Sequence, residues 1–191
     1  MRIITGSAKG VRLATLEGET TRPTSERVKE AVFSMLQFDI EGRKVLDLFA
    51  GSGQLALEAI SRGAAEAVLV DRSKDAIKII NGNIAKTRFA DRCRVFCLDW
   101  KDYIRRFKGE RFDIVFLDPP YASGLYAPAL SELLSSDMIK PTTLIVCESD
   151  STQIFGKDSS LAEKFREVKT SRYSKTVITV LSLVAAEEKE Q

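Results

Sequence analysis

One stretch of this 191-residue sequence reads Val45-Leu46-Asp47-Leu48-Phe49-Ala50-Gly51-Ser52-Gly53. Its first five residues form a mostly apolar run, which is typical of a strand buried on both faces. The glycines that follow allow a tight turn, and residues 55–60 continue with apolar side chains at helical spacing. The stretch therefore predicts a strand, a glycine turn and a helix. In an open α/β sheet, ligands bind beside such a turn, at the carboxyl ends of the strands.

The same alternation continues along the chain. Further apolar runs occupy residues 67–71, 94–98, 112–117 and 144–147, and helical patterns lie at residues 74–86 and around 103–107. Continuous apolar strands that alternate with helices predict a parallel sheet with helices on both faces. Two later runs, residues 165–173 and 175–184, leave little room for a helix between them. We predict that they form an antiparallel pair that completes a mostly parallel seven-stranded sheet of an α/β fold.

The two ends of the chain differ from this pattern. Residues 1–16 contain short β-like segments with turn glycines at Gly6 and Gly10, and a helix follows that Thr24 can cap. Residues 187–191 are polar. We predict a single domain over residues 1–191, with a small hairpin-like extension at residues 1–20 and a flexible tail at residues 185–191.

The composition excludes several classes of protein. The hydrophobic content of 44% and charged content of 29% are ordinary for a globular protein. No apolar run approaches the length of about 20 residues that a membrane span needs, and the N-terminus lacks the pattern of a signal peptide. A cytoplasmic location without a membrane partner is the resulting expectation, and a monomer is the default.

The absence of histidine limits the chemistry further. It excludes Ser-His-Asp and Cys-His mechanisms, and no metal site is expected. The three cysteines form no CxxC pair, which suits a reducing compartment. Cys93 and Cys97 lie in an apolar stretch, and we expect both to be buried space-filling residues.

Acidic residues that suit a nucleoside ligand lie at or near the ends of the first three predicted strands. Asp47 belongs to the first strand, Asp71 ends the second, and Asp99 follows the third. Asp71 is placed to hold two ribose hydroxyls, and Asp99 would lie beside an adenine ring. Because Asp47 would repel a pyrophosphate and attract an ammonium group, the set favours S-adenosylmethionine over a nicotinamide cofactor. The predicted cofactor-binding residues are Asp47, Phe49, Ala50, Gly51, Ser52, Gly53, Asp71, Arg72, Asp99 and Trp100.

The fourth strand ends in a second motif, Asp118-Pro119-Pro120-Tyr121. Consecutive prolines fix the backbone and remove amide donors, which leaves carbonyl oxygens that can accept hydrogen bonds. A carboxylate and a carbonyl together can accept both hydrogens of an –NH2 group and direct its lone pair toward a methyl donor. Tyr121 offers a flat face on which a base can stack. We therefore predict that these four residues form the catalytic motif.

With both motifs, the sequence resembles a Rossmann-like class I methyltransferase with the Asp-Pro-Pro-Tyr signature of amino-group methylation. It is more specifically similar to the RsmD-type family of 16S rRNA guanine-N(2) methyltransferases. The segments that carry this resemblance are residues 2–6, 9–10, 22–31, 46–53, 57–59, 61–64 and 118–121. Gln54 and Ala56 depart from the family, which usually has a small residue and a glycine there. The resemblance implies methylation of the exocyclic amine of one guanine in 16S rRNA, within the small ribosomal subunit or an assembly intermediate of it.

Basic residues gather in two parts of the chain, although the net charge is only +2. One part is the first 29 residues, and the other is the stretch of residues 86–111. Solvated helix faces explain such clusters as well as a phosphate-binding surface does. Near Thr24, the arginines could equally face the cofactor carboxylate or RNA phosphate. The predicted RNA-binding residues are Arg2, Lys9, Arg12, Arg22, Arg27, Arg105 and Arg106.

Three other functions are compatible with parts of this pattern. DNA adenine methylation shares the Asp-Pro-Pro-Tyr signature, but such enzymes usually add a sizeable target-recognition region, for which this chain has no insertion. A non-catalytic RNA-binding protein on a methyltransferase scaffold would not need the intact motif. A nicotinamide oxidoreductase would use the glycine turn, because residues 51–56 also fit the dinucleotide fingerprint with alanine third.

Overall fold

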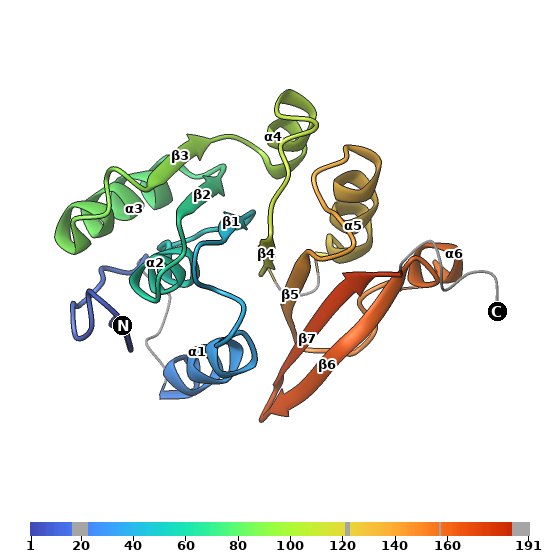
Figure 1. Ribbon diagram of the computed structural model, residues 1–191, viewed down its shortest axis with the longest axis horizontal. Coiled ribbons are helices and arrows are strands. Elements are labelled where there is room, and N and C mark those ends of the chain that lie inside the picture. The colour runs from blue at the N-terminus through green and yellow to red at the C-terminus, as the bar shows by residue number, and fades with distance from the viewer. Residues whose placement is uncertain (17–22, 121–122, 157, 185–191) are drawn as a thin grey trace.

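The computed structural model describes residues 1–16, 23–120, 123–156 and 158–184. Strands and helices alternate along these residues, as Figure 1 shows. The helices are α1 (Pro23–Met35), α2 (Gln54–Ser61), α3 (Lys74–Thr87), α4 (Trp100–Arg106), α5 (Tyr126–Ser135) and α6 (Ser159–Ala162). The strands are β1 (Lys44–Asp47), β2 (Glu66–Asp71), β3 (Cys93–Cys97), β4 (Ile114–Leu117), β5 (Leu144–Ser149), β6 (Phe165–Tyr173) and β7 (Thr176–Leu183).

The strands form one seven-stranded sheet in the order β3-β2-β1-β4-β5-β7-β6. The first five strands are parallel neighbours, and β7 pairs antiparallel with both β5 and β6. This confirms the Rossmann-like class I fold, including the closing antiparallel pair. The last strand of the chain does not lie at the edge of the sheet, because it inserts between β5 and β6. The strand order reverses between β1 and β4, which is where a ligand cleft is expected.

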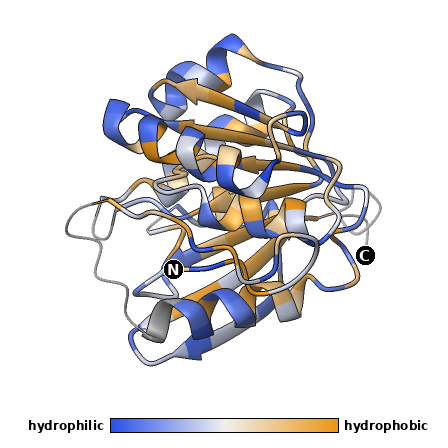
Figure 2. Cartoon of the chain, turned by 90° about the vertical axis from the view of Figure 1, so that its left-hand side faces the viewer, coloured by the Kyte–Doolittle hydropathy of each residue, from blue (hydrophilic) through white to orange (hydrophobic). Residues whose placement is uncertain are grey.

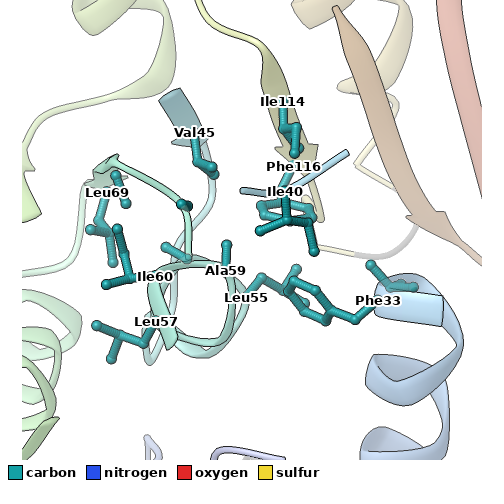
Figure 3. Close-up of a cluster of buried hydrophobic side chains, with 14 of the residues drawn as sticks. Phe33, Ile40, Val45, Leu55, Leu57, Ala59, Ile60, Leu69, Ile114 and Phe116 are labelled. Carbon is teal, nitrogen blue, oxygen red and sulfur yellow. The ribbon is translucent and has the colours of Figure 1, made fainter. Parts of the chain in front are cut away.

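Two hydrophobic clusters cover the two faces of the sheet. One lies under α1, α2 and α3, and the other lies under α4, α5 and α6. Figure 3 shows the first cluster, where Phe33 of α1 and Leu55 of α2 lie close to Phe116 of β4. Figure 2 shows apolar strands between helices whose outer faces are polar. Burial of apolar side chains on both faces is the main force that holds such a sheet together.

Three local expectations from the sequence were wrong. The first helix begins at Pro23, one residue before Thr24, so Thr24 is inside the helix rather than at its cap. Proline is favoured at a first helical position because its missing N–H would have no partner there. Cys93 is partly exposed and Cys97 is exposed. Both lie on β3, which forms an edge of the sheet and is not covered as the central strands are.

No helix in the described residues is long and apolar enough to span a membrane. Residues 1–13 fold back on themselves through an antiparallel bridge between Arg2 and Arg12, with Ile3 N donating to Val11 O at 3.0 Å. The extent of the domain, and the behaviour of residues 185–191, stay predictions because that tail lies outside the described residues.

Candidate active site

A cavity of about 730 Å³ opens at the carboxyl ends of β1, β2 and β4. This volume lies within the usual range for a small-molecule site. Nine predicted site residues line it: Phe49, Gly51, Asp71, Arg72, Asp99, Trp100, Asp118, Pro119 and Pro120. Five residues that the sequence analysis did not select also line it: Leu16, Leu48, Leu98, Ser123 and Leu125. The cofactor motif and the Asp-Pro-Pro motif therefore share one cleft.

The glycine turn between β1 and α2 shapes one wall of this cavity. Gly51 and Gly53 have φ of 54° and 77°, in the left-handed region that favours glycine. A Cβ at Gly53 would approach the side chain of Leu69 to 2.9 Å, so glycine there also lets α2 pack against the sheet. Of the predicted residues in this turn, Ala50, Ser52 and Gly53 are buried beneath the cavity wall rather than lining it.

Asp71 lines the cavity at the end of β2. Its Oδ2 accepts a hydrogen bond from Gly51 N at 2.9 Å, and its Oδ1 accepts one from Ser73 N at 2.8 Å. These two donors fix the orientation of the carboxylate. Because each carboxylate oxygen can accept two hydrogen bonds, Asp71 shapes the glycine turn and can still bind hydroxyl groups of a ligand.

Asp99 and two aromatic rings form the adjacent wall. Asp99 caps α4, where its Oδ1 accepts a hydrogen bond from Lys101 N at 2.9 Å. The rings of Phe49 and Trp100 lie with their centroids 6.3 Å apart and tilted by 44°. Leu98 adds a further apolar side chain. This part of the cavity can hold a flat aromatic ring and present a carboxylate to its edge.

Asp47 lies behind the glycine turn, 2% exposed and outside the cavity wall. Its Oδ1 has no hydrogen-bond partner among the described residues. Burial raises the pKa of Asp47 to about 7, although backbone amides of Ala56 and Phe49 favour the ionised form. The negative charge of Asp71 raises the pKa further. A buried carboxyl that lacks a cation is a group that a positively charged ligand can stabilise.

Asp118, Pro119 and Pro120 line the same cavity as Asp71. Asp118 follows β4 directly and is partly buried. The carbonyl of Pro120 accepts a hydrogen bond from Ser123 N at 3.2 Å, so Pro119 provides the carbonyl that is better placed to receive a ligand. Tyr121, the fourth predicted catalytic residue, lies outside the described residues.

The N-terminal segment, whose Leu16 lines the cavity, is held in place by Asn83, a residue that sequence reasoning missed. Asn83 is fully buried on α3, its Oδ1 accepts from Ala14 N at 2.8 Å, and its Nδ2 donates to Ala14 O at 3.0 Å. The same Nδ2 donates to Ser52 O at 2.9 Å. Asn83 thus joins the segment before Leu16 to the glycine turn. The available signal was a polar residue on the apolar face of a predicted helix.

Glu58 fastens the other end of this segment to α2. Its carboxylate is fully buried and accepts hydrogen bonds from Ile4 N at 2.7 Å and Thr5 N at 3.0 Å. Lys29 Nζ lies 3.4 Å from Glu58 Oε2 and donates to Arg2 O at 2.6 Å. A buried charge is tolerated when it is paired and hydrogen-bonded in this way. The N-terminal extension is therefore anchored to α1 and α2 by buried polar contacts.

The structure does not bring the predicted RNA-binding residues onto one surface. Exposed Arg2, Lys9, Arg12 and Arg27 belong to the N-terminal segment and α1, on the α1–α3 face of the sheet. Exposed Arg105 and Arg106 lie in the last turn of α4, which covers the opposite face. Arg22 lies outside the described residues.

Several other cations of the basic stretch at residues 86–111 are paired within the protein. Lys101 Nζ lies 3.0 Å from Glu132, and Arg111 lies 2.7 Å from Asp137.

The two departures from the family pattern, Gln54 and Ala56, lie at the start of α2, where Ala56 is fully buried. The buried Oε1 of Gln54 has no partner among the described residues.

The family described as Conserved hypothetical protein 95 matches residues 1–182. The chain belongs to this family, the RsmD-type methyltransferases. It is 36% identical over 154 residues to the putative rRNA methyltransferase YlbH of Bacillus subtilis, a match that covers 78% of this chain and 83% of that protein. It is 34% identical over 152 residues to the ribosomal RNA small subunit methyltransferase D of Haemophilus influenzae, covering 78% and 79% of the two chains.

A solved structure confirms the shared fold. The putative methyltransferase yhhF from Escherichia coli aligns with a TM-score of 0.82 and 29% identity, covering 97% of this chain and 98% of that one. S-adenosylmethionine is the cofactor of this RsmD-type methyltransferase. The cleft fits it, because the cavity has the size of a nucleoside site and the unpartnered oxygen of Asp47 suits a nearby ammonium group.

Proposed function

We propose that this chain methylates the exocyclic 2-amino group of a guanine in 16S rRNA of the small ribosomal subunit. The broader activity, S-adenosylmethionine-dependent methylation of ribosomal RNA, follows from the family and its relatives. One observation carries the proposal at this site: Asp118 and Pro119 line the same cavity as Asp71 and Asp99. A base amine held at the first pair would face a methyl group on a cofactor held at the second pair.

The cofactor residues keep their predicted roles in this proposal. Asp71 would accept hydrogen bonds from the ribose hydroxyls, and Asp99 would lie at the edge of an adenine ring held near Phe49 and Trp100. Asp47 would attract the ammonium group of the methionine portion from behind the glycine turn. S-adenosylmethionine would supply a methyl group bound to a sulfonium sulfur, from which a neutral thioether leaves readily.

At the part of the cleft where the base amine would bind, alignment of the reacting atoms matters more than a strong base. Asp118 and the carbonyl of Pro119 accept the two hydrogens of the amine, so that the nitrogen lone pair points toward the methyl carbon. Attack of the nitrogen on the methyl carbon would break the carbon–sulfur bond and leave its electron pair on sulfur. The amine then loses one proton, and Asp118 is the acceptor. Positioning of this kind supplies a large part of the rate acceleration in group transfer.

RNA binding is assigned to the N-terminal segment and α1. Arg2, Lys9, Arg12 and Arg27 expose guanidinium and ammonium groups on the same face of the sheet. Arg2 lies 3.4 Å from Glu26 and keeps 61% of its side chain exposed, so this ion pair leaves it accessible to phosphate. Contacts of this kind make affinity strongly dependent on salt. Arg105 and Arg106, on the other face, would contact a different part of the ribosomal particle.

The test is transfer of tritium from labelled S-adenosylmethionine into small subunits from cells that lack the enzyme, followed by nucleoside analysis. We expect a labelled N(2)-methylguanosine peak, absent from subunits of cells that contain the enzyme. Label in another nucleoside would disprove the guanine assignment while it kept the chemistry. Label in duplex DNA but in no rRNA would favour DNA adenine methylation instead. The absence of label from every acceptor, with cofactor binding intact, would favour a non-catalytic RNA-binding role.

A further inference from the structure

Asn83 of α3 joins segments that are distant in the sequence. Its side chain is fully buried, and Nδ2 donates to Ala14 O at 3.0 Å and to Ser52 O at 2.9 Å. Its Oδ1 accepts a hydrogen bond from Ala14 N at 2.8 Å. One amide group therefore fastens both the N-terminal segment and the glycine turn to the same point of α3.

Asparagine suits this position because its short amide supplies two donors and an acceptor. A carboxylate of the same size has no N–H to donate, and an apolar side chain has neither donor nor acceptor. Ser52 is only 3% exposed, and an unpaired carbonyl oxygen in a buried place is costly. Replacement of the amide would therefore loosen the contact between the two segments that Asn83 joins.

The N-terminal segment lies beside α2 and α3, as Figure 1 shows, and each helix holds a different part of it. Glu58 and Ser61 of α2 bind the backbone of residues 4–8. Among the described residues, Asn83 is the side chain that binds the backbone of residues 14–16. The hydrogen bonds at this end of the segment are thus set by Asn83.

Leu16 lies two residues after Ala14, and its side chain lines the cavity. Two residues of chain span at most about 7 Å. Because Ala14 and Ser52 bind the same amide, this reach brings Leu16 close to the glycine turn. Gly51 of that turn also lines the cavity. Leu16 and the glycine turn therefore form neighbouring parts of the cavity wall.

An ordered apolar residue in this wall favours binding of a ligand. Leu16 is partly exposed, so a cofactor in the cavity would bury more of its apolar surface. Burial of apolar surface favours binding, whereas the ordering of a chain segment during binding opposes it. Since Asn83 already holds the segment, its ordering does not have to accompany cofactor binding.

We propose that Asn83 is a positioning residue for the cofactor: it holds Leu16 in the cavity wall, so that S-adenosylmethionine binds against an ordered N-terminal segment. The inference rests on the cofactor lying in this cavity and is independent of which base is methylated. Because linkage is reciprocal, bound cofactor stabilises the docked segment by the same factor by which the docked segment favours the cofactor.

The first experiment is a double-mutant cycle on the affinity for S-adenosylmethionine, measured by isothermal titration of the full-length protein. The variants are Asn83→Ala, Leu16→Ala and the two combined, with Thr87→Val as the control. The buried hydroxyl of Thr87 donates to the backbone oxygens of Asn83 and Ile84 at 2.9 and 3.1 Å. The control therefore loses a buried polar group of the same helix and keeps every hydrogen bond of the Asn83 side chain.

We expect Asn83→Ala and Leu16→Ala each to weaken the affinity by about threefold to tenfold, as for loss of part of a leucine contact. The combined variant should lose less than the product of the two single losses, because Asn83 acts through Leu16. Leu16→Met keeps an apolar side chain of similar volume and should bind nearly as tightly as wild type. Thr87→Val should keep wild-type affinity although its melting temperature falls.

Hydrogen exchange of backbone amides gives a second readout, which decides the question even if Asn83→Ala does not fold. Saturating S-adenosylmethionine should slow exchange in residues 11–16 by about threefold to tenfold in wild type and in Thr87→Val. In Leu16→Ala the cofactor should no longer slow it. This variant should fold, because it truncates a side chain that is partly exposed.

Three results would overturn the inference. Independent losses that multiply in the combined variant would mean that Asn83 acts through the glycine turn alone. Wild-type affinity and exchange in Leu16→Ala would mean that the cofactor does not contact this residue. Equal losses of affinity in Asn83→Ala and Thr87→Val would mean that only the stability of α3 matters. An unchanged affinity in Asp71→Ala is a different outcome, because it would place the cofactor outside this cavity and contradict the proposed site itself.

Discussion

The two edges of the central sheet carry the same kinds of acidic residue in opposite surroundings. At the amino edge, Lys44 Nζ lies 2.7 Å from Glu110, and Arg94 pairs with both Glu110 and Glu66. Asp113 forms an ion pair with Lys140, whose Nζ lies 2.6 Å from Asp113 Oδ1. Each of these acids has at least one cation, so this edge holds the starts of the strands together.

At the carboxyl edge, two acids lack such pairing with cations among the described residues. Asp47 has an unpartnered oxygen, and Glu148 has no cation beside it. Burial raises the pKa of both groups to about 7. At the amino edge, burial also acts to raise the pKa of Glu110 and Asp113, but hydrogen bonds from lysine and arginine outweigh it and lower both values. The paired acids of the amino edge thus stabilise the fold, whereas acids without a cation at the carboxyl edge can interact with a ligand.

The largest expected effect compares the two ends of β4. Asp118→Ala should lower turnover by about a hundredfold to ten-thousandfold, the range for a positioned proton acceptor, while cofactor affinity and stability change little. Asp113→Asn, at the amino end of the same strand, should keep turnover and lose some stability. Steady-state kinetics and thermal unfolding of both variants check this. A variant without Asp118 that keeps most of its rate would disprove the catalytic assignment.

The next effect uses pH without cofactor. Asp47 holds its proton more tightly when folded than its ordinary pKa of 3.8 implies, so wild type loses stability as pH rises from about 4 through about 7. Asp47→Asn removes this loss. Its free energy of unfolding, relative to that of wild type, should therefore rise by about 2–3 kcal/mol from pH 5 to pH 8. Urea unfolding at several pH values measures the difference.

Glu110→Gln serves as the matched change at the amino edge. Its free energy of unfolding, relative to that of wild type, should change with pH in the opposite direction. Because the pKa of Glu110 is lowered in the folded state, its stabilising contribution is present above its ordinary pKa of 4.5 and is lost as the pH falls further. The variant should therefore be less stable than wild type near neutral pH, and the difference should close in acid. If the unfolding free energies of the two variants changed with pH in the same way, the proposed difference between the two edges would be wrong.

Asp71→Ala should weaken binding of S-adenosylmethionine by about 1.5–3 kcal/mol, through loss of hydrogen bonds to a charged acceptor. Asp71→Asn keeps one acceptor oxygen and should lose less. Isothermal titration at fixed pH measures both affinities. An unchanged affinity in Asp71→Ala would contradict its proposed contact with the ribose.

The smallest effect belongs to an exposed pair at the amino edge. Glu66 is 36% exposed on its side chain, and its partners Lys44 and Arg94 retain Glu110. Glu66→Gln should cost no more than about 1 kcal/mol of stability, and the loss should shrink at high salt. Cofactor affinity should not change. A large loss of affinity would mean that the two edges are coupled more tightly than their contacts indicate.

The sequence alone determined the fold class, the strand–turn–helix unit at residues 45–60 and the place of Asp118 after β4. These features depend on local patterns, because an apolar run followed by glycines, or by two prolines, restricts the backbone within a few residues. Three acids after three successive strands must meet at one edge once the sheet is parallel. Asp71, Asp99 and Asp118 accordingly line one cavity.

Tertiary structure alone decided how distant segments complete that cavity. Leu16 reaches it because Asn83 binds Ala14, 69 residues away in the sequence. Glu148 lies beside Asp118 because β4 and β5 pair in one register, and a shift by one residue would turn its side chain to the other face. Cys97 is exposed because β3 lies at the edge of the sheet. Strand order, register and long-range hydrogen bonds arise from packing between segments, and no local pattern records them.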